Sequence, residues 1–349
     1  MVLYIIIGII MFGLLILLHE LGHFSFAKLF KVGINEFSIG MGPKLFSKKA
    51  KDGVDYSLRA LPIGGYVSMV GEDDDGDGAE NALCTKPVWQ RFIIIAAGAL
   101  TNILVGFIIM GILVASSDIY SVTIERFNFG DENGNLIEME SWQGLEIGDE
   151  IIRVDNRKIH VRADLVYAAM DKADTPCTLT ALRDGKEIKI ENFVFPTYTS
   201  DGMLFGSANF FMPEKLAKTP LEVIKQSVFQ SISTLRMMWS TLLGAVSGKY
   251  GTEAVSGPVG IVTEIKETAS YGFSALMYLI MLISMNVGMF NLLPFPALDG
   301  GRLVFLLIEA VRGKPINPKY EGYVHLAGMV LLLTLMVFIT FNDITKLIR

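Results

Sequence analysis

Two histidines and a glutamate near the start of the chain have the spacing of a metal-dependent hydrolase. His19, Glu20 and His23 form a His-Glu-x-x-His pattern inside an apolar run. Residues four apart share one face of a helix, so two neutral imidazoles can bind one Zn²⁺ there, with the carboxylate between them as general base. Ionisable groups are costly within an apolar segment and indicate function. The motif therefore predicts peptide hydrolysis at membrane depth, with one zinc ion per chain.

A zinc site of this kind needs a third protein ligand, which is usually a carboxylate. We expect Asp299 to supply it. It ends the segment Asn291-Leu-Leu-Pro-Phe-Pro-Ala-Leu-Asp299, and no charged residue interrupts the chain between Glu267 and Asp299. His325 is an alternative ligand, but a histidine at a helix end is more simply explained as solvated or capped.

The composition predicts an integral membrane protein. Hydrophobic residues make up 51% of the 349 residues and the mean hydropathy is +0.46, which is too apolar for a water-facing globule. About 20 apolar residues cross a bilayer, and residues 3–27, 92–117, 272–293 and 323–342 meet this requirement. The first stretch lacks the marks of a cleaved signal peptide, so we expect it to be retained. In the second, Gly98, Asn102 and Gly106 predict close helix packing with an amide contact.

Lysines and arginines indicate the orientation, because cytoplasmic loops carry the excess of positive charge. Nine lie between the first two spans and four between the last two, whereas in the long segment between the second and third spans acidic residues outnumber basic ones. Both loops are therefore predicted to be cytoplasmic, and the long segment between the second and third spans extracytoplasmic. Both sets of predicted ligands then lie in the cytoplasmic third of the membrane. The two cysteines, Cys84 and Cys177, fall on opposite sides, so no internal disulfide is expected. The net charge of -6 gives no sign of nucleic-acid binding.

The expected fold is a polytopic α-helical membrane protein of four transmembrane helices with a small membrane-associated β-sheet and an inserted extracytoplasmic α+β domain. The predicted segments are a first transmembrane helix (1–33), a cytoplasmic β region with an acidic loop (34–91), a second helix (92–117), a compact domain (118–200), an amphipathic helical region (201–271), a third helix with the Leu-Asp-Gly motif (272–301), a cytoplasmic loop (302–322), and a fourth helix with the tail (323–349).

Residues 34–70 read as short strands and turns. Residues 56–61, the turn Pro62-Ile-Gly64-Gly65, and 66–70 can form a hairpin in a small sheet against the inner membrane face. A substrate helix must unwind before it can be cut, and its extended backbone then needs new hydrogen-bond partners. The hairpin edge can supply these by β-augmentation. We expect Gly64 and Gly65 to permit close backbone approach there, next to Tyr66.

The extracytoplasmic segment contains the pattern Gly144-Leu-x-x-Gly148-Asp149, a helix over 163–171 and a hairpin over 177–193 with an Asp-Gly turn. Together these resemble a bacterial PDZ domain. Residues 213–249 are amphipathic at helical spacing, which fits either a half-buried helix or one lying along the membrane surface.

Five motifs together resemble the site-2 protease family, in particular its bacterial RseP/RasP type. They are His-Glu-Leu-Gly-His in the first span, Phe-Ser-Ile-Gly-Met-Gly-Pro, Pro-Ile-Gly-Gly-Tyr-Val, Gly-Pro-Val-Gly-Ile, and Asn-Leu-Leu-Pro-Phe-Pro-Ala-Leu-Asp-Gly-Gly. The similarity covers nearly the whole chain. The chain departs from the RseP form in one respect, because it has room for one PDZ-like domain and not for a tandem pair.

The resemblance implies a multi-pass intramembrane zinc metalloprotease of the bacterial cytoplasmic membrane. It would cut single-span substrates such as anti-sigma factors or remnant signal peptides, in regulated intramembrane proteolysis. It also implies that Asn286 and Asn291 hold the unwound substrate, although interhelical hydrogen bonding is an alternative role for both.

Two other functions would use the same metal site. A metal transporter would need further ligands stepping across the bilayer, and the sequence offers none near the outer ends of the spans. A non-catalytic membrane chaperone would need the histidines but not Glu20, so the intact glutamate argues against it.

Overall fold

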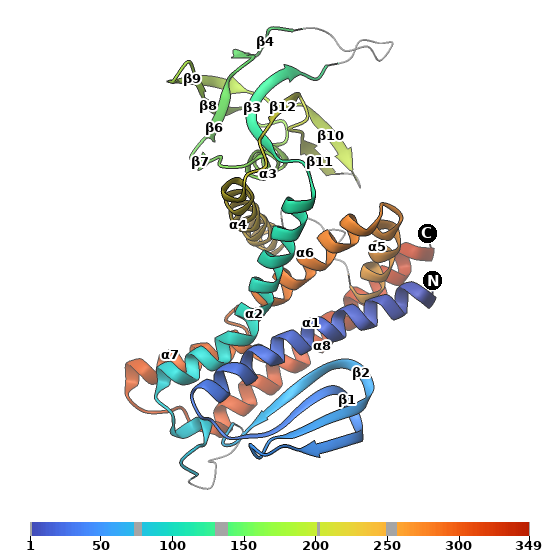
Figure 1. Cartoon of the computed structure of the whole chain (residues 1–349), viewed down its shortest axis with the longest axis vertical. Coiled ribbons are helices and arrows are strands. Elements are labelled where there is room, and N and C mark those ends of the chain that lie inside the picture. The colour runs from blue at the N-terminus through green and yellow to red at the C-terminus, as the bar shows by residue number, and fades with distance from the viewer. Residues whose placement is uncertain (1, 73–78, 130–138, 201–202, 249–256, 349) are drawn as a thin grey trace. The chain divides into compact units, whose positions relative to one another are not determined.

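A computed structural model describes residues 2–72, 79–129, 139–200, 203–248 and 257–348 (Figure 1). Most of the predicted acidic loop, residues 73–78, lies outside this range. The chain divides into two compact units. Unit 1 comprises Met1–Ile109 and Leu243–Arg349, and unit 2 comprises Met110–Leu242.

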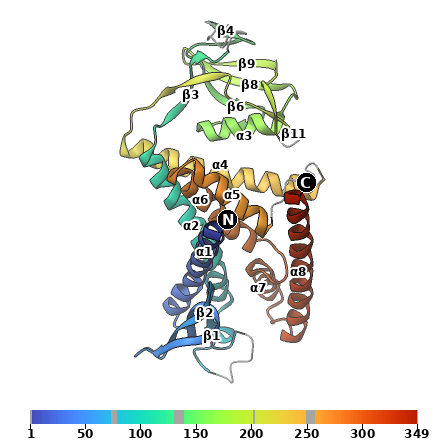
Figure 2. The same cartoon turned by 90° about the vertical axis from the view of Figure 1, so that its right-hand side faces the viewer.

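Within these described ranges, four helices are long and apolar enough to cross a membrane, which confirms the four predicted spans. They are α1 (Val2–Leu29), α2 (Val88–Ser116), α6 (Phe273–Asn291) and α8 (Pro318–Ile348). Much of their apolar surface is exposed, as expected of helices that face lipid. The start of α1 and the end of α8 lie at the same end of unit 1 in both views (Figures 1 and 2).

Strands β1 (Ile34–Lys49) and β2 (Asp55–Met69) pair antiparallel in a strongly bent sheet. Residues 44–49 pair with 55–59, while 34–39 pair with 65–69. The predicted hairpin within 56–70 is therefore wrong, because β2 runs through Pro62 and Gly64 and both of its halves pair with β1. The bends fall where glycine permits a positive φ, at Gly40 (84°) and Gly64 (72°).

The sheet lies along α1 instead of at its end. A Cβ on Gly13 would stand 2.6 Å from the Pro62 carbonyl oxygen, and one on Gly64 would stand 2.7 Å from Cγ2 of Ile16. These close contacts, at the middle of α1, leave the residues 62–69 running beside the helix. The sheet is therefore packed against the side of α1.

Two shorter helices complete unit 1. Helix α5 (Pro258–Ser270) begins at the buried carboxylate of Asp343, whose Oδ2 accepts hydrogen bonds from the amides of Gly257 (3.0 Å) and Gly260 (2.8 Å). Helix α7 (Asp299–Arg312) occupies most of the segment predicted as a loop over 302–322. It forms because its apolar face is buried against α2, which a short hydropathy window does not detect.

Unit 2 is built on a six-stranded sheet of order β12-β3-β6-β8-β9, with β7 beside β6. Its strands are β3 (Tyr120–Phe127), β6 (Glu150–Val154), β7 (Arg157–Lys158), β8 (Cys177–Arg183), β9 (Lys186–Phe193) and β12 (Phe211–Lys215). Two small hairpins pair β4 (Ser141–Trp142) with β5 (Leu145–Glu146) and β10 (Thr197–Ser200) with β11 (Met203–Gly206). Helix α3 (Arg162–Lys172) lies beside the large sheet (Figure 2).

The predicted helix over 163–171 and the hairpin over 177–193 are confirmed. The hairpin turns at Asp184 and Gly185, both at positive φ. The sheet, however, continues past residue 200, the predicted end of the domain, because β12 pairs with β3. The sequence did not predict this strand because it contains Pro213, and proline is tolerated only in edge strands such as β12.

Helix α4 (Pro220–Val246) buries polar side chains and exposes apolar ones, the opposite of a helix packed on the core of a soluble protein. Its buried side carries Gln226, Ser231 and Thr234, whereas large apolar side chains are exposed. The exposed ones are Leu221, Ile224, Val228, Trp239 and Leu243. An apolar stripe that faces outward is typical of a helix at a membrane surface.

Candidate metal centre

Three side chains from two distant parts of unit 1 converge on one point. His19 and His23 are buried on α1, and Asp299 is the first residue of α7. The two Nε2 atoms are 3.1 Å apart, and Oδ2 of Asp299 lies 3.0 Å from Nε2 of His19 and 3.4 Å from Nε2 of His23. Ligand atoms around a tetrahedral Zn²⁺ at 2.0–2.1 Å stand about 3.3 Å from one another. The three atoms therefore fit one zinc ion.

A hydrogen bond to the backbone orients one of the imidazoles. Nδ1 of His23 donates to the carbonyl oxygen of Ile94 on α2, at 2.8 Å. This contact selects the tautomer whose Nε2 carries a lone pair, and it is the usual outer partner of a metal-binding histidine. The opposite nitrogen is thus free to bind metal.

Glycines on α2 and α1 make room for the imidazoles. A Cβ at Gly98 would stand 2.7 Å from Cε1 of His23 and 2.8 Å from Nε2 of His19. A Cβ at Gly22 would stand 2.5 Å from both the Ala97 carbonyl oxygen and the Thr101 hydroxyl oxygen. Helices α1 and α2 therefore approach closely at the centre, and Gly98 has a role that its spacing in the sequence did not reveal.

The predicted amide contact of Asn102 on the same stripe is wrong. Its side chain is fully buried, and neither amide atom has a hydrogen-bond partner among the described residues. The hydroxyl of Ser284 on α6 donates instead to the backbone carbonyl of Asn102, at 2.8 Å. Gly106 does match the predicted close packing, since a Cβ there would overlap Met285.

Asp299 is presented by a tight turn between α6 and α7. Ala297 adopts a positive φ of 74°, and its amide donates to Nδ1 of His325 on α8, at 2.9 Å. A Cβ at Gly301 would stand 2.6 Å from the Phe295 carbonyl oxygen, so the turn needs a glycine there. His325, the alternative ligand, lies outside the His19, His23 and Asp299 group and contacts the turn two residues before Asp299.

The carboxylate of Glu20 lies beside the edge of the sheet. Its Oε2 accepts a hydrogen bond from the backbone amide of Val67, at 3.1 Å. Val67 pairs with Phe37 on β1, so an amide directed at Glu20 points away from the sheet. The sequence held no sign of this contact, because it is made by backbone.

The predicted substrate-binding residues are only partly brought together. Gly65 lies against the Ser38 carbonyl, so it serves close strand pairing. The hydroxyl of Tyr66 contacts Arg59 within an ion-pair network around Glu36. On α6, the side chain of Asn291 donates to the Val287 carbonyl of its own helix, at 3.0 Å.

Asn286 and Gly64 complete the predicted set. Asn286 is half-buried on α6. Gly64 stands at the bend of β2 against Ile16 of α1. Gly64 and Tyr66 thus lie on the strand segment that passes Glu20, whereas the two asparagines belong to a different helix.

Fold and site together define a helical membrane protein with a His-His-Asp group, whose histidines are buried, and with the carboxylate of Glu20 next to it in the chain. The model of Peptidase family M50 matches residues 7–335. A putative zinc metalloprotease of Fusobacterium nucleatum is 36% identical over 345 residues, 98% of each chain. The regulator of sigma-W protease RasP of Bacillus subtilis is 30% identical over 421 aligned positions, 97% of each chain. A probable protease of Enterococcus faecalis, Eep, is 28% identical, covering 97% of this chain and 98% of its own.

The chain belongs to peptidase family M50, the site-2 protease family. It is a membrane zinc metalloprotease, and Zn²⁺ is its cofactor.

Proposed function

We propose that this enzyme hydrolyses peptide bonds within or near the transmembrane segments of single-span proteins, with Glu20 as catalytic base and with His19, His23 and Asp299 as the zinc ligands. The observation that carries the proposal is the position of the three ligand atoms. Two of them belong to a 28-residue apolar helix, α1, which is long enough to cross a bilayer. A metal-binding group at that place is costly unless it acts on something within the membrane.

The chain's own groups supply positioning and proton transfer. Bound Zn²⁺ contributes Lewis acidity, which acidifies water and polarises a carbonyl. Glu20, next to the ligands on α1, accepts the proton of the attacking water and delivers it to the departing amine. The amide of Val67 keeps the carboxylate directed at this point. The turn at Ala297 sets the position of Asp299.

An unwound substrate pairs with the sheet edge at Tyr66 and Val67. The Val67 amide is already donated to Glu20. The carbonyl of the same residue points the same way, away from β1, which leaves a backbone acceptor for β-augmentation. Gly64 opens the edge at its bend, and Asn286 and Asn291 on α6 are the side chains that we assign to the other side of the substrate. Gly65 contributes through the sheet, because it allows β1 and β2 to approach.

The enzyme spans the bacterial cytoplasmic membrane, with the metal centre toward the cytoplasmic side. The lysines and arginines of the loops between α1 and α2 and between α6 and α8 support this orientation. Unit 2 is then extracytoplasmic. We assign its sheet and α3 to a PDZ-like domain that excludes or recognises ectodomains, and α4, with its exposed apolar face, to the membrane surface.

Anti-sigma factors and remnant signal peptides are the substrates that the family resemblance suggests. The Bacillus subtilis relative is named as a regulator of sigma-W protease. Both substrate classes are single apolar helices, so an enzyme with its site inside the membrane suits them.

Cleavage of a single-span substrate by the wild type and by Glu20→Gln tests the function. The variant should lose at least about 100-fold in rate, because general base catalysis contributes 10²–10⁴-fold, and it should keep its zinc. Unchanged cleavage by a zinc-loaded variant would disprove the mechanism. Asp299→Ala should lose zinc.

The alternative of a metal transporter predicts further ligand groups along the spans. Within the described residues, His19, His23 and Asp299 form the one such group. A chaperone role would leave Glu20 without purpose, although the Val67 amide holds its carboxylate in place.

A further inference from the structure

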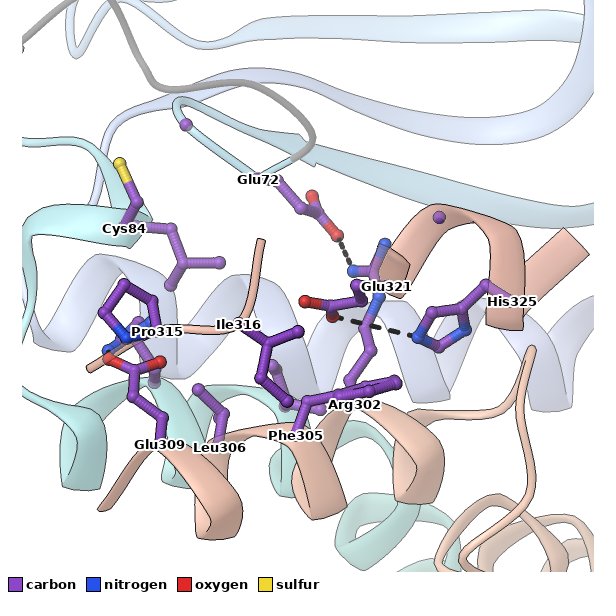
Figure 3. Close-up of a pocket in the computed structure, with 15 residues that line it drawn as sticks. Glu72, Cys84, Arg302, Phe305, Leu306, Glu309, Pro315, Ile316, Glu321 and His325 are labelled. Carbon is purple, nitrogen blue, oxygen red and sulfur yellow. Dashed lines mark hydrogen bonds and ion pairs between the residues drawn. The ribbon is translucent and has the colours of Figure 1, made fainter. Parts of the chain in front are cut away.

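A pocket of 510 Å³ lies within unit 1 and has no role in the chemistry described above (Figure 3). Its volume is within the range of about 300–1,000 Å³ that is common for ligand sites. The lining comes from both loops that we assign to the cytoplasm and from the helices next to them.

The pocket is adjacent to the metal centre at two points. Arg302 lines it one helical turn after Asp299 on α7. His325 lines it through the ring whose Nδ1 accepts the Ala297 amide. A substrate whose peptide bond lies at the metal centre can therefore place a nearby side chain in the pocket.

The pocket also begins where the sheet edge ends. The edge passes Glu20 at Val67, and the next wall residues of the pocket along the chain are Gly71 and Glu72. Glu72 is tied to the end of β2, since its Oε2 accepts the Met69 amide at 3.3 Å. A strand rises about 3.3 Å per residue, so a peptide paired with this edge reaches the pocket about four to five residues beyond the bond next to Glu20.

The charges of the pocket favour a cation over an anion. Three carboxylates, Glu72, Glu309 and Glu321, and two guanidinium groups line the pocket, so these groups carry a net negative charge. Oε1 of Glu321 lies 3.8 Å from Nε2 of His325 (Figure 3). Arg302 contacts Glu72 at 2.5 Å, and Arg91 pairs with Glu309. Glu321 is the most accessible carboxylate, with 34% of its side chain exposed against 18% for Glu72 and 15% for Glu309.

The remaining lining suits the stem of a long side chain. Leu83, Ile95, Phe305 and Leu306 provide apolar surface beneath the charged groups. Lysine and arginine bury their methylene stems on apolar surface and keep the charged head in a polar environment. Such residues are also what single-span proteins carry on the cytoplasmic side of their membrane helix.

We propose that this pocket is a substrate subsite that binds a Lys or Arg side chain on the cytoplasmic flank of the substrate, about four to five residues from the cleaved bond. The inference rests on the proposed intramembrane cleavage and adds a charge preference to it. Glu321 is the specificity-determining residue.

A substrate series tests the subsite with the full-length enzyme in proteoliposomes. One Lys is moved through the second to eighth positions on the cytoplasmic side of the cleaved bond, with Gln at the others, and kcat/KM is measured. The wild type should prefer Lys over Gln at about the fourth to fifth position by roughly 2- to 5-fold, the effect of a half-exposed ion pair. In Glu321→Gln this ratio should fall close to one, and in Glu321→Lys a substrate with Glu there should be preferred.

Each ratio compares two substrates of the same variant, so a partial loss of folded enzyme cancels. Glu80→Gln is the matched control, because it removes the same charge from an exposed residue outside the pocket lining, in the other of the two loops predicted to be cytoplasmic. It should keep the wild-type ratio. A wild type that cuts all positions equally, or an unchanged ratio in Glu321→Gln, overturns the subsite alone. Preference for Glu in the wild type shows that the pocket takes an anion and also overturns it. A wild type that cuts no member of the series overturns the proposed function.

Discussion

Gly98 shows how much of the metal centre depends on a residue that binds nothing. The imidazoles of His19 and His23 occupy the space where its side chain would be. In Gly98→Ala the new methyl must displace at least one ring, and a ligand displaced by a few tenths of an ångström no longer meets the 2.0–2.1 Å that Zn²⁺ requires. We expect at least a 10-fold loss of zinc affinity, measured by competition with a chelator, and a parallel loss of activity.

Gly111→Ala is the control for this change. It lies on the same helix, and its Cβ would meet only the Ser227 hydroxyl oxygen, at 3.9 Å. Zinc affinity should stay at the wild-type value there. Equal affinity in both variants would mean that the centre tolerates a wider separation of α1 and α2 than the structure indicates.

Glu36 should make the sheet sensitive to acid. Burial opposes its ionisation, but the hydrogen bonds that it accepts outweigh burial and lower its pKa from 4.5 to about 2. The donors are Ser57, Tyr66, Lys44 and Arg59. Because the pKa is depressed in the folded state, the stabilisation is complete above pH 5 and is lost as the pH falls toward 2. We expect this stabilisation to be about 2 kcal/mol, less than the full shift in pKa implies, because solvent screens the exposed Lys44 end of the network.

Thermal unfolding of the wild type and Glu36→Gln between pH 7 and pH 2 measures this contribution. The wild type should have the higher midpoint at pH 7, and the two curves should converge toward pH 2. A constant difference over this range would show that the carboxylate's charge is not what stabilises the sheet.

At the residue scale, the sequence was informative where chemistry restricts the residue type. Only a few side chains bind zinc, so His19, His23 and Asp299 could be selected in advance, and the structure places their ligand atoms together. The Val67 amide could not be selected, because every non-proline residue has one. The spacing of Gly98 predicts close helix packing, but it does not say that the residues packed against Gly98 are His19 and His23.

At the element scale, the turn between α6 and α7 positions Asp299, the first residue of α7. Helix α8 packs against it closely, since a Cβ at Gly328 would stand 2.5 Å from the Pro296 carbonyl oxygen. One turn earlier on α8, His325 accepts the Ala297 amide. The turn is held in a strained conformation by α8, and Asp299 follows two residues later.

His325→Ala should therefore weaken zinc binding without abolishing it. The Ala297 amide loses its acceptor, and loss of a partner that orients a metal ligand costs 10–100-fold in metal affinity. His325→Asn should restore part of the affinity, because its side-chain oxygen can accept the same hydrogen bond. Zinc loss in His325→Ala as complete as that in Asp299→Ala would instead identify His325 as a ligand.

The elements were predictable to different degrees for a physical reason. A helix that faces lipid must be apolar over its whole length, and this signal located all four spans. The sheet of β1 and β2 gave no such signal. Its bends at Gly40 and Gly64 depend on which half of β2 pairs with which half of β1, and that choice is made by packing against α1.

At the scale of the whole molecule, the orientation in the membrane decides which compartment receives each product and which flank of a substrate meets the pocket beside α7. The two cysteines report on it directly. Cys84 is exposed in the loop between α1 and α2, whereas Cys177 is buried in unit 2. A thiol reagent that cannot cross membranes should therefore react with the wild type only at Cys84, and only after intact cells are permeabilised.

Asn156→Cys supplies the opposite signal, because Asn156 is exposed in the turn between β6 and β7 of unit 2. In a Cys84→Ser background this thiol should be labelled in intact cells without permeabilisation. Labelling of Cys84 in intact cells, with Asn156→Cys protected, would reverse the orientation. The basic flank of a substrate would then lie on the side away from Glu321, and the pocket would lose its proposed ligand.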